Sequence, residues 1–299
     1  MNKKTILSSN FPEFLRKWKR YHNKFKKVNS WYITSDYCLE NKEKPNDVMT
    51  FTIFPLGNPY IIKEEIKRYL PKDIKDFKNI SEDAIKYIKE SPYFFSLAVI
   101  IKDKNNIFNL ESNKLLLDRI IENMSNWPDN KKNEFIHKIK NFKEYLNRKT
   151  VDLKTLSEIN VTVHIMSAIL EFLLIKANAK KIIWISDRDK ITSFRDGVIH
   201  KFIRLGYSNL VHKRVNDNEV YGFLTNEEYD KDVFDELIRI PDYISGAIAS
   251  MDFSDSYKVA EKHYNLFDKG IVDNEKIYIM QIEHNQNSDT LSELQFSRI

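Results

Sequence analysis

The sequence predicts an α/β protein in which a mixed β-sheet is flanked by helices and carries a helical insertion. Two apolar runs joined by a polar loop, WYITSDYC from Trp31 and VMTFTIFPLG from Val48, indicate an antiparallel hairpin. A short apolar run, KIIWIS from Lys181, is typical of a central strand. Long stretches with apolar residues at helical spacing separate these runs, and this order is typical of a sheet covered by helices.

The chain begins with a segment that predicts an amphipathic helix. Phe11, Leu15, Trp18 and Phe25 recur at helical spacing and form its expected buried stripe. Cations interleave with the aromatic residues Trp18, Tyr21, Phe25 and Trp31, a composition that suits a phosphate backbone and unstacked bases. The same cations can equally be solvated on the outer face of the helix, so both interpretations stay open. They are Arg16, Lys17, Lys19, Arg20, Lys24, Lys26 and Lys27.

The middle of the chain predicts helices on either side of one strand. Helical periodicity covers residues 61–70 and 81–90, and residues 93–102 are the most strand-like segment of the chain. Residues 111–149 predict two helices. The mostly apolar stretch 161–180 has the length of a helix that is buried on more than one side.

After KIIWIS the sequence predicts a helix and short strands. The helix is expected from about Thr192 to Leu205, and strand-like pieces follow in SNLVHKRV and EVYGFLT. The segment ELIRIPDYISGAIASMD predicts an extended stretch up to Pro241 and then a helix with a face of small residues. A sheet of about five strands is therefore expected.

One domain with helical elaborations is the expected organisation. The 299 residues, 42% of them hydrophobic, can bury a sizeable core, and only 6 Gly and 8 Pro leave little room for a flexible linker. The domain is expected to cover residues 1–285, with elaborations at about 61–92 and 111–178 and a polar tail at 286–299.

Cysteine content and hydropathy predict a cytoplasmic protein. Cys38 is the single cysteine, so no internal disulfide can form, and no cluster of Cys and His has zinc spacing. The basic N-terminus lacks an apolar segment of signal-peptide length, and Glu171 interrupts the longest apolar run. A membrane span is therefore not expected.

Four aspartates next to predicted strands and a predicted helix form the candidate site. Asp36 ends the first strand, Asp187 and Asp189 follow KIIWIS, and Asp242 follows Pro241. If the first strand and KIIWIS are neighbours, Asp36 and Asp187 emerge at one edge of the sheet, and a helix that crosses this edge adds Asp242. Clustered carboxylates repel each other unless cations bind between them, and oxygen ligands suit Mg²⁺ or Mn²⁺.

Such a site predicts a metal-dependent nuclease, since two ions about 4 Å apart support in-line displacement at a phosphodiester. Asp36 is assigned to bridge both ions, and Asp187 and Asp242 each complete one of them. Each aspartate taken alone also has a structural explanation as a helix cap, a turn residue or a partner of a helix dipole.

Three short motifs resemble a known family. WYITSDYC, IIWISDRD and above all IPDYISGAIASMD resemble a widespread family of uncharacterised bacterial proteins with a ribonuclease-H-like fold. In that family one aspartate ends the first strand, another ends the fourth strand and the last lies in a C-terminal helix, which are the positions of Asp36, Asp187 and Asp242. The resemblance implies a nuclease-like metal site, in phage defence or a mobile element. The usual first motif continues with a Gly or a Glu-Ser pair, whereas here Tyr37 and Cys38 follow.

Other residues could complete this site. Glu171, inside the apolar run ILEFLLI, and Asp47, at the end of the hairpin loop, could each supply a fourth ligand or have only a structural role. His200 could aid proton transfer. Three cations near the acids could hold the scissile phosphate or simply neutralise the aspartates. They are Arg188, Lys190 and Arg195.

Two further functions stay open. IIWISDRDKIT loosely fits the start of haloacid-dehalogenase-like phosphatases, in which the first aspartate, here Asp187, attacks phosphorus and the second, Asp189, serves as acid and base. A ribonuclease-H-like scaffold could also bind nucleic acid or a protein without cutting it, because a fold alone does not establish activity. DNA and RNA are equally compatible with the sequence, as are endonuclease and exonuclease activity.

Overall fold

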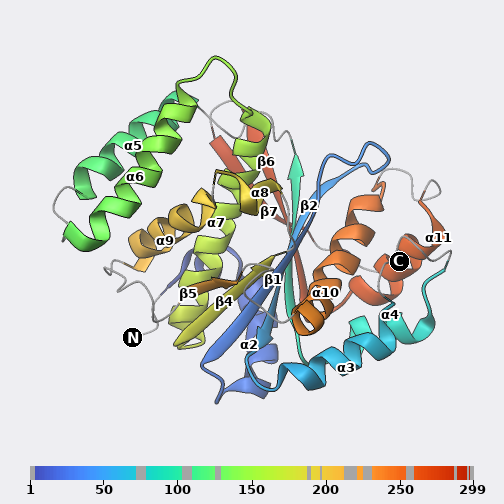
Figure 1. Ribbon diagram of the computed structural model, residues 1–299. Helices are drawn as coiled ribbons and strands as arrows, with labels where there is room; N and C mark the ends of the chain where they lie inside the picture. The colour runs from blue at the N-terminus through green and yellow to red at the C-terminus, as the bar shows by residue number, and fades with distance from the viewer. Residues whose placement is uncertain are drawn as a thin grey trace. The chain divides into compact units, whose positions relative to one another are not determined.

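The protein is an α/β protein built around one mixed β-sheet (Figure 1). The computed structural model describes residues 4–71, 79–102, 110–124, 129–186, 190–195, 197–211, 221–224, 231–253, 259–285, 288–294 and 296. The chain forms two compact units. The sheet unit comprises Met1–Lys102, Leu170–Asp187 and Asn216–Ile299, and the helical unit comprises Asp103–Ile169 and Arg188–Val215.

The described part of the sheet has seven strands, two more than the sequence predicts. They are β1 (Ser30–Cys38), β2 (Asp47–Pro55), β3 (Phe95–Lys102), β4 (Lys181–Ser186), β5 (Tyr221–Leu224), β6 (Ile277–Asn285) and β7 (Ser288–Leu294). Their order across the sheet is β5-β4-β1-β2-β3-β6-β7. The predicted hairpin is confirmed, because β1 and β2 pair antiparallel. β3 is antiparallel to β2, whereas β4 is parallel to β1 and β5 is parallel to β4.

The C-terminal strands β6 and β7 extend the sheet beyond β3. β6 is parallel to β3, and β7 pairs antiparallel with β6. β7 lies within the stretch that the sequence predicts to be a polar tail. It forms a strand because β6 offers it hydrogen-bonding partners along a free sheet edge, a feature that local composition does not reveal.

Successive residues of β1 point to opposite faces of the sheet, and helices cover both faces. On one face Trp31 contacts Trp18 of α2 (Pro12–His22), which also packs on Phe95 of β3. On the other face Tyr32 contacts Phe234 of α10 (Lys231–Ser250). Of the predicted stripe, Phe11 and Trp18 are buried, whereas Leu15 and Phe25 are only partly buried, and Phe14 and Tyr21 complete the buried face of this helix. The remaining described helices that belong to this unit alone include α1 (Ile6–Asn10), α3 (Pro59–Tyr69), α4 (Glu82–Glu90) and α11 (Glu261–Asn265).

α10 continues without interruption through Pro241, so the extended stretch predicted before this proline is wrong. A proline inside a helix leaves the carbonyl four residues earlier without its N–H donor. That carbonyl belongs to Leu237, and it accepts a hydrogen bond of 3.4 Å from the hydroxyl of Thr34, a buried residue of β1. The sheet therefore supplies the missing donor, and tertiary packing overrides the local preference.

The helical unit has its own apolar core. It contains α5 (Leu110–Met124), α6 (Asp129–Leu146), the first part of α7 (Leu153–Lys176), α8 (Lys190–Ser193) and α9 (Val198–Val211). Core residues include Ile139, Phe142, Leu146, Leu156 and Val198. The strand predicted in SNLVHKRV is wrong at its first four residues, which belong to α9, and the other four lie outside the described residues.

Among the described helices, α7 alone is long and apolar enough to cross a membrane, with a mean hydropathy of 1.6. Within the protein, 72% of this apolar stretch is buried. Such burial is typical of the core helix of a soluble protein. A cytoplasmic location stays a prediction.

Candidate active site

Asp36 lies on the face of the sheet that α10 covers. It follows Tyr32 and Thr34 at alternate positions of β1, and both of these residues contact α10. The half-buried carboxylate of Asp36 accepts a hydrogen bond from the hydroxyl of Ser245, which also belongs to α10. Asp36 is therefore held between a strand and a helix, and it is not a solvated strand terminus.

Asp242 lies one helical turn before Ser245 on α10. The Ser245 hydroxyl that binds Asp36 is 3.2 Å from the carbonyl oxygen of Asp242. Burial raises the pKa of the Cys38 thiol, Lys44 lowers it, and the carboxylates of Asp36 and Asp242 raise it further. The Ser245 hydroxyl contacts both Asp36 and Asp242, so the structure brings together two of the predicted site residues.

The third predicted acid, Asp187, lies outside the described residues, as do Arg188 and Asp189. The strands that lead to Asp36 and Asp187 are neighbours and run parallel, with Ser35 opposite Ser186. The predicted pairing of these two strands is confirmed, but Asp36 lies within β1 (Ser30–Cys38) and not at its end. The position of the Asp187 carboxylate stays a prediction.

Two hydroxyl groups accompany the carboxylates. Thr50 of β2 is directly opposite Asp36, and its buried hydroxyl has no hydrogen-bond partner among the described residues. The hydroxyls of Thr50 and Ser245 and the carboxylates of Asp36 and Asp242 are all oxygen donors, the ligand type that Mg²⁺ and Mn²⁺ prefer. Among the described residues, however, no group of three or more His, Cys, Asp and Glu side chains is arranged to hold a metal ion. A complete metal site would need a further acid from the part of the chain that is not described.

Asn46, in the hairpin loop, anchors the C-terminal end of α10. Its side-chain amide donates to the carbonyl oxygens of Met251 at 2.6 Å and Ile248 at 3.3 Å, and its backbone N–H donates to Ala249 at 3.2 Å. Lys102 in turn donates to the Asn46 side-chain oxygen at 2.8 Å. This buried asparagine therefore fixes the end of α10 to the hairpin.

Sequence reasoning missed Ser245 and Asn46 as supporting residues. Ser245 is the small residue of the IPDYISGAIA motif, and its position one turn after Asp242 was the available signal. Asn46 precedes Asp47 in a stretch that predicts only a turn. The contact of Ser245 with Asp36 and that of Asn46 with the end of α10 each join segments that are far apart in the sequence, so the local pattern could not predict them.

The opposite face of β1 and β4 carries a buried hydrogen-bond network. The Ser35 hydroxyl accepts from the Trp184 indole at 2.9 Å and donates to the Ser186 hydroxyl at 3.0 Å. The Tyr37 hydroxyl lies 2.9 Å from the same Ser35 oxygen. These contacts join β1, which contains Asp36, to the end of β4, which directly precedes Asp187 in the sequence.

Glu171 and Asp47 have structural roles in the described contacts. Glu171 is 5% exposed, and its carboxylate accepts a hydrogen bond of 3.0 Å from the backbone N–H of Ile6 at the start of α1. Burial raises the pKa of Glu171. Asp47 accepts a hydrogen bond of 2.6 Å from the backbone N–H of Glu40, which closes the hairpin loop.

His200 belongs to the helical unit. Burial, together with the nearby cations Arg204, Lys138 and Lys201, lowers the pKa of its imidazole to about 3. A general acid or base for neutral conditions titrates near the working pH. His200 is therefore not suited to the proton transfer for which it was considered.

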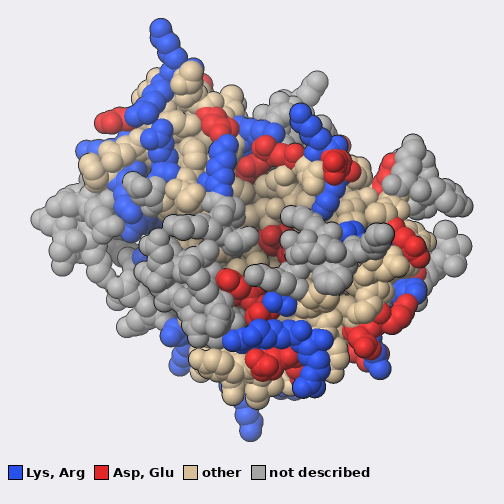
Figure 2. Space-filling view, turned by 45° about the vertical axis from the view of Figure 1, so that its right-hand side comes forward, with Lys and Arg blue, Asp and Glu red and all other residues tan. Residues whose placement is uncertain are grey.

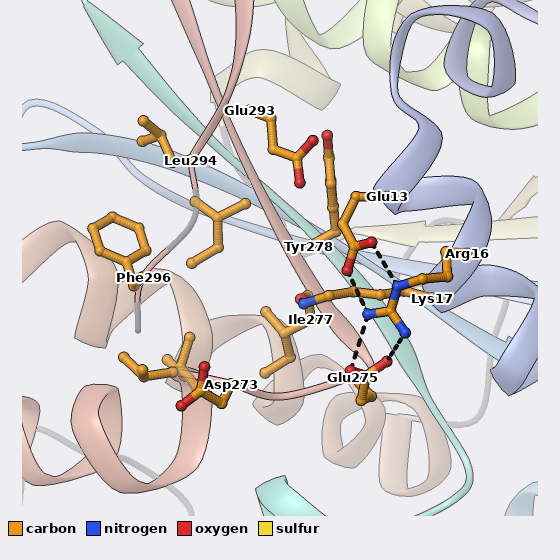
Figure 3. Close-up of a pocket in the computed structure, with 13 residues that line it drawn as sticks. Glu13, Arg16, Lys17, Asp273, Glu275, Ile277, Tyr278, Glu293, Leu294 and Phe296 are labelled. Carbon is orange, nitrogen blue, oxygen red and sulfur yellow. Dashed lines mark hydrogen bonds and ion pairs between the residues drawn. The ribbon is translucent and has the colours of Figure 1, made fainter. Parts of the chain in front are cut away.

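Figure 3 shows a pocket lined by residues of α2, β6 and β7. Its volume is about 280 Å³, and neither Asp36 nor Asp242 lines it. Arg16, which lines it, forms ion pairs with Glu13 and Glu275, and Arg20 also pairs with Glu275. Hydrogen bonds from Arg16 lower the pKa of both carboxyl groups. Because these charges neutralise each other, the pocket does not favour a phosphate.

The other cations predicted on the N-terminal segment divide into two kinds. Lys17 donates to the carbonyl oxygens of Asn274 and Ile277, each at 2.9 Å, so its ammonium group is engaged within the protein. Lys19 and Lys24 are exposed, and neither forms an ion pair with a described residue.

The cations predicted near KIIWIS lie in the helical unit where they are described. Lys190 forms an ion pair of 2.6 Å with Asp152. The guanidinium of Arg195 lies over the ring of Tyr145, 4.2 Å from its centroid.

No protein-family model, curated protein or solved structure matches the chain.

Proposed function

We propose that the protein is a nuclease that hydrolyses phosphodiester bonds of nucleic acid with Mg²⁺ or Mn²⁺. The observation that carries the proposal is the contact between Asp36 and α10, in which Ser245 binds the Asp36 carboxylate one turn after Asp242. A second observation supports it, since the buried Thr50 hydroxyl lies opposite Asp36 and is bound by no residue in the described part of the chain.

We further propose that the strand core is ribonuclease-H-like, as the resemblance of the three motifs implies. β1 carries the first aspartate, and β4, the fourth strand along the chain, lies beside β1 and runs parallel to it. Asp187 follows β4 directly, and α10 carries the last aspartate of the motif. The order and direction of these elements support the proposal.

Asp36 and Asp242, with Asp187, would hold the metal. A bound Mg²⁺ or Mn²⁺ would stabilise the charge that develops on the phosphate oxygens during an in-line displacement. The Ser245 hydroxyl would orient the Asp36 carboxylate, as partners of ligating carboxylates do in metal sites. Asn46 would hold the helix that carries Ser245 and Asp242 against the hairpin.

The phosphatase hypothesis receives less support. It assigns chemistry to Asp187 and Asp189 only, and it gives no role to the contact between Asp36 and Ser245. A scaffold that binds without cutting would explain this contact as packing, and the following experiment separates it from a nuclease.

Asp36→Asn and Asp242→Asn test the proposal, because each keeps the shape of the side chain and removes its charge. Hydrolysis of labelled single-stranded and duplex DNA and RNA with Mg²⁺ or Mn²⁺ should fall by more than about 100-fold, since even partners of metal ligands contribute about 10–100-fold. Asp235→Asn is the matched control, because Asp235 is an exposed acid on the same helix. It should cleave as the unmodified protein does.

Thermal unfolding without and with Mn²⁺ completes the test. The metal should raise the midpoint of unfolding for the unmodified protein and for Asp235→Asn, because it binds the folded state, and it should not do so for Asp36→Asn. Without metal, Asp36→Asn should be at least as stable as the unmodified protein, because charge crowding is relieved. Unchanged cleavage by Asp36→Asn, or its unfolding, would make Asp36 a structural residue and overturn the proposal.

A further inference from the structure

We infer that the nucleic-acid backbone binds to the helical unit, at a basic cluster made of Arg148 and Arg195, which lie over the Tyr145 ring, and of Lys149, which follows Arg148 in the chain. The inference rests on the proposed function, in that the bound polyanion is taken to be the substrate. It assigns phosphate binding to a surface other than the N-terminal helix, where the composition of the sequence suggested it.

The positive charge of the chain is concentrated in the helical unit. This unit contains 18 Lys and Arg against 11 Asp and Glu, whereas the sheet unit contains 30 against 32. The net charge of +5 therefore arises from a helical unit of +7 and a sheet unit of −2. Figure 2 shows one face of the protein, on which blue Lys and Arg side chains occur at the upper left and along the lower edge, with red Asp and Glu side chains between them. A surface with an excess of positive charge attracts a polyanion over a distance of about one Debye length.

Two guanidinium groups of the cluster are held by one aromatic ring. The Cζ atom of Arg195 lies 4.2 Å from the centroid of the Tyr145 ring, and that of Arg148 lies 5.9 Å from it. Tyr145 is 6% exposed and packs against Phe142 and Phe194, so the ring is a fixed support. A planar guanidinium on such a ring is preorganised for phosphate oxygens.

The backbone that carries Arg148 and Lys149 is tied at both ends. These residues lie between α6 and α7. The Tyr145 hydroxyl accepts a hydrogen bond of 2.8 Å from the backbone N–H of Asp152, and the Asp152 carboxylate accepts one of 3.0 Å from the N–H of Thr155 in the first turn of α7. The two cations are thus presented on a short, closed turn.

None of the three cations forms an ion pair with a described residue, and all three are exposed. Lys190 differs, because it pairs with Asp152. Burial raises the pKa of Asp152, but hydrogen bonds from Lys190 and Thr155 outweigh this and lower it to about 2, so Asp152 stays charged. The nearby acid is therefore already neutralised by Lys190, and the charges of the cluster remain for a ligand.

The N-terminal helix offers a contrast. Arg16 and Arg20 are paired with Glu275, and the Lys17 ammonium is bound by two carbonyl oxygens. A cation at the C-terminal end of α6 would also be favoured by the helix dipole. This helix dipole does not explain the position of Arg195, because Arg195 belongs to a separate segment and lies over the same Tyr145 ring.

The chemistry of the cluster favours phosphate over bases. The Tyr145 ring is buried and covered by guanidinium, so it offers no free face on which a base could stack. Phosphate contacts fix the position of a nucleic acid but carry no sequence information directly. Binding should therefore be independent of sequence and strongly dependent on salt.

The experiment measures binding without cleavage. Full-length protein with Asp36→Asn is titrated in EDTA against a labelled duplex of about 20 base pairs, between about 50 and 200 mM salt. Replacing Arg148, Lys149 and Arg195 together by Gln should reduce the slope of log affinity against log salt by about 2–3, at about 0.9 for each lost phosphate contact. At the lowest salt the affinity should fall by at least tenfold.

The matched control replaces Lys19, Lys24 and Lys27 by Gln, which removes the same charge from exposed cations of the N-terminal segment. Its slope should change by less than about 1. An equal loss in the control, or an unchanged slope in the cluster variant, would overturn the inference. If the triple cluster variant does not fold, the three single variants replace it, and each should reduce the slope by about 0.9.

The outcomes separate this inference from the proposed function. Salt-dependent binding at the cluster, combined with no metal-dependent cleavage by the unmodified protein, would overturn the nuclease and leave the binding surface standing. Absence of any salt-dependent binding to the duplex would overturn the inference, whatever the result for cleavage.

Discussion

Lys276 is a buried lysine whose pKa is lower than that of an exposed lysine. It is 8% exposed, and its ammonium donates to the carbonyl oxygens of Ile88 and Lys89 at 3.1 and 2.5 Å. These carbonyls lie in the last turn of α4, where no intrahelical donor remains for them. The group also lies 5.0 Å from the centroid of the Phe94 ring. Burial lowers the pKa of Lys276 to about 7.

This lowered pKa predicts a rise in stability with pH. Between pH 7 and about 10.5 the unfolded chain binds a proton at Lys276 that the folded protein has released, so the free energy of unfolding should increase by up to about 1.4 kcal/mol per pH unit. Below pH 7 Lys276 is protonated in both the folded and the unfolded protein, so the full cost of burying its charge lowers the free energy of unfolding. Urea unfolding at several pH values should show that Lys276→Met removes this rise.

Lys269→Met is the control for Lys276. Lys269 pairs with Glu82 at 2.8 Å, and its side chain is 43% exposed. This variant should keep the pH dependence of the unmodified protein. An equal rise in Lys276→Met would show that Lys276 titrates as an exposed lysine does.

At the scale of elements, α10 is defined by its contacts with the sheet. Thr34 donates to the Leu237 carbonyl that Pro241 leaves without a donor, and Asn46 binds the carbonyls at the end of the helix. α10 carries Asp242 and Ser245, so these contacts also set where the candidate site lies. A helix that looks interrupted in sequence is continuous because the strand beside it completes its hydrogen bonds.

A double-mutant cycle tests this arrangement. Thr34→Val should lower the free energy of unfolding by about 1–3 kcal/mol, because it leaves the buried Leu237 carbonyl without a donor. In a Pro241→Ala background the restored N–H can serve this carbonyl, so the same Thr34→Val substitution should cost less than half as much. Urea unfolding of the four proteins gives both costs.

Thr52→Val serves as the control for the cycle. Thr52 lies opposite Thr34 on β2, and its buried hydroxyl lies 2.9 Å from the Ser96 hydroxyl on β3 and forms no described hydrogen bond with α10. Its cost should be the same with Pro241 and with Ala at position 241. Equal costs for Thr34→Val in the two backgrounds would contradict the role assigned to Thr34.

At the scale of the whole molecule, the chain is divided into two units with separate cores and opposite net charge. The core of the helical unit is built from α5, α6, α7 and α9, and that of the sheet unit lies between the sheet and its helices. The acidic sheet unit carries the candidate catalytic aspartates, and the basic helical unit carries the inferred binding surface. The two proposals therefore place catalysis and backbone binding in different units.

Separate cores predict separate local stability. Ile139 is fully buried in the helical unit, and Ile139→Ala should cost about 2–5 kcal/mol. Hydrogen exchange should then accelerate across α5, α6 and α9, while the central strands β1 to β3 keep their protection. Ile33→Ala, at an equally buried position of β1, should affect the central strands instead. Equal loss of protection in both units after Ile139→Ala would show that they unfold together.

Much of the fold could be predicted because its signals are local. The hairpin of β1 and β2, the strands β3 and β4 and the helices α3 to α7 follow from hydrophobic periodicity and from turn and cap residues that act over a few positions. β7 could not be predicted, because its partner β6 stabilises a segment of polar composition. The continuity of α10 was missed because its missing donor comes from Thr34, more than 200 positions earlier.

The sequence by itself determined an α/β protein with a central hairpin, and it predicted, without showing it, that Asp36 and Asp242 belong to one site. Only the tertiary structure decided how they are held, because the Ser245 hydroxyl that binds Asp36 is 209 positions away along the chain. Likewise, only the tertiary structure distinguished cations that are neutralised from cations that remain exposed. Arg16 pairs with Glu275, which is 259 positions away along the chain, whereas Arg195 lies over the ring of Tyr145. The type of a residue sets its charge, but folding sets which group lies beside that charge. This neighbouring group determines whether the charge is neutralised within the protein or remains available to a ligand.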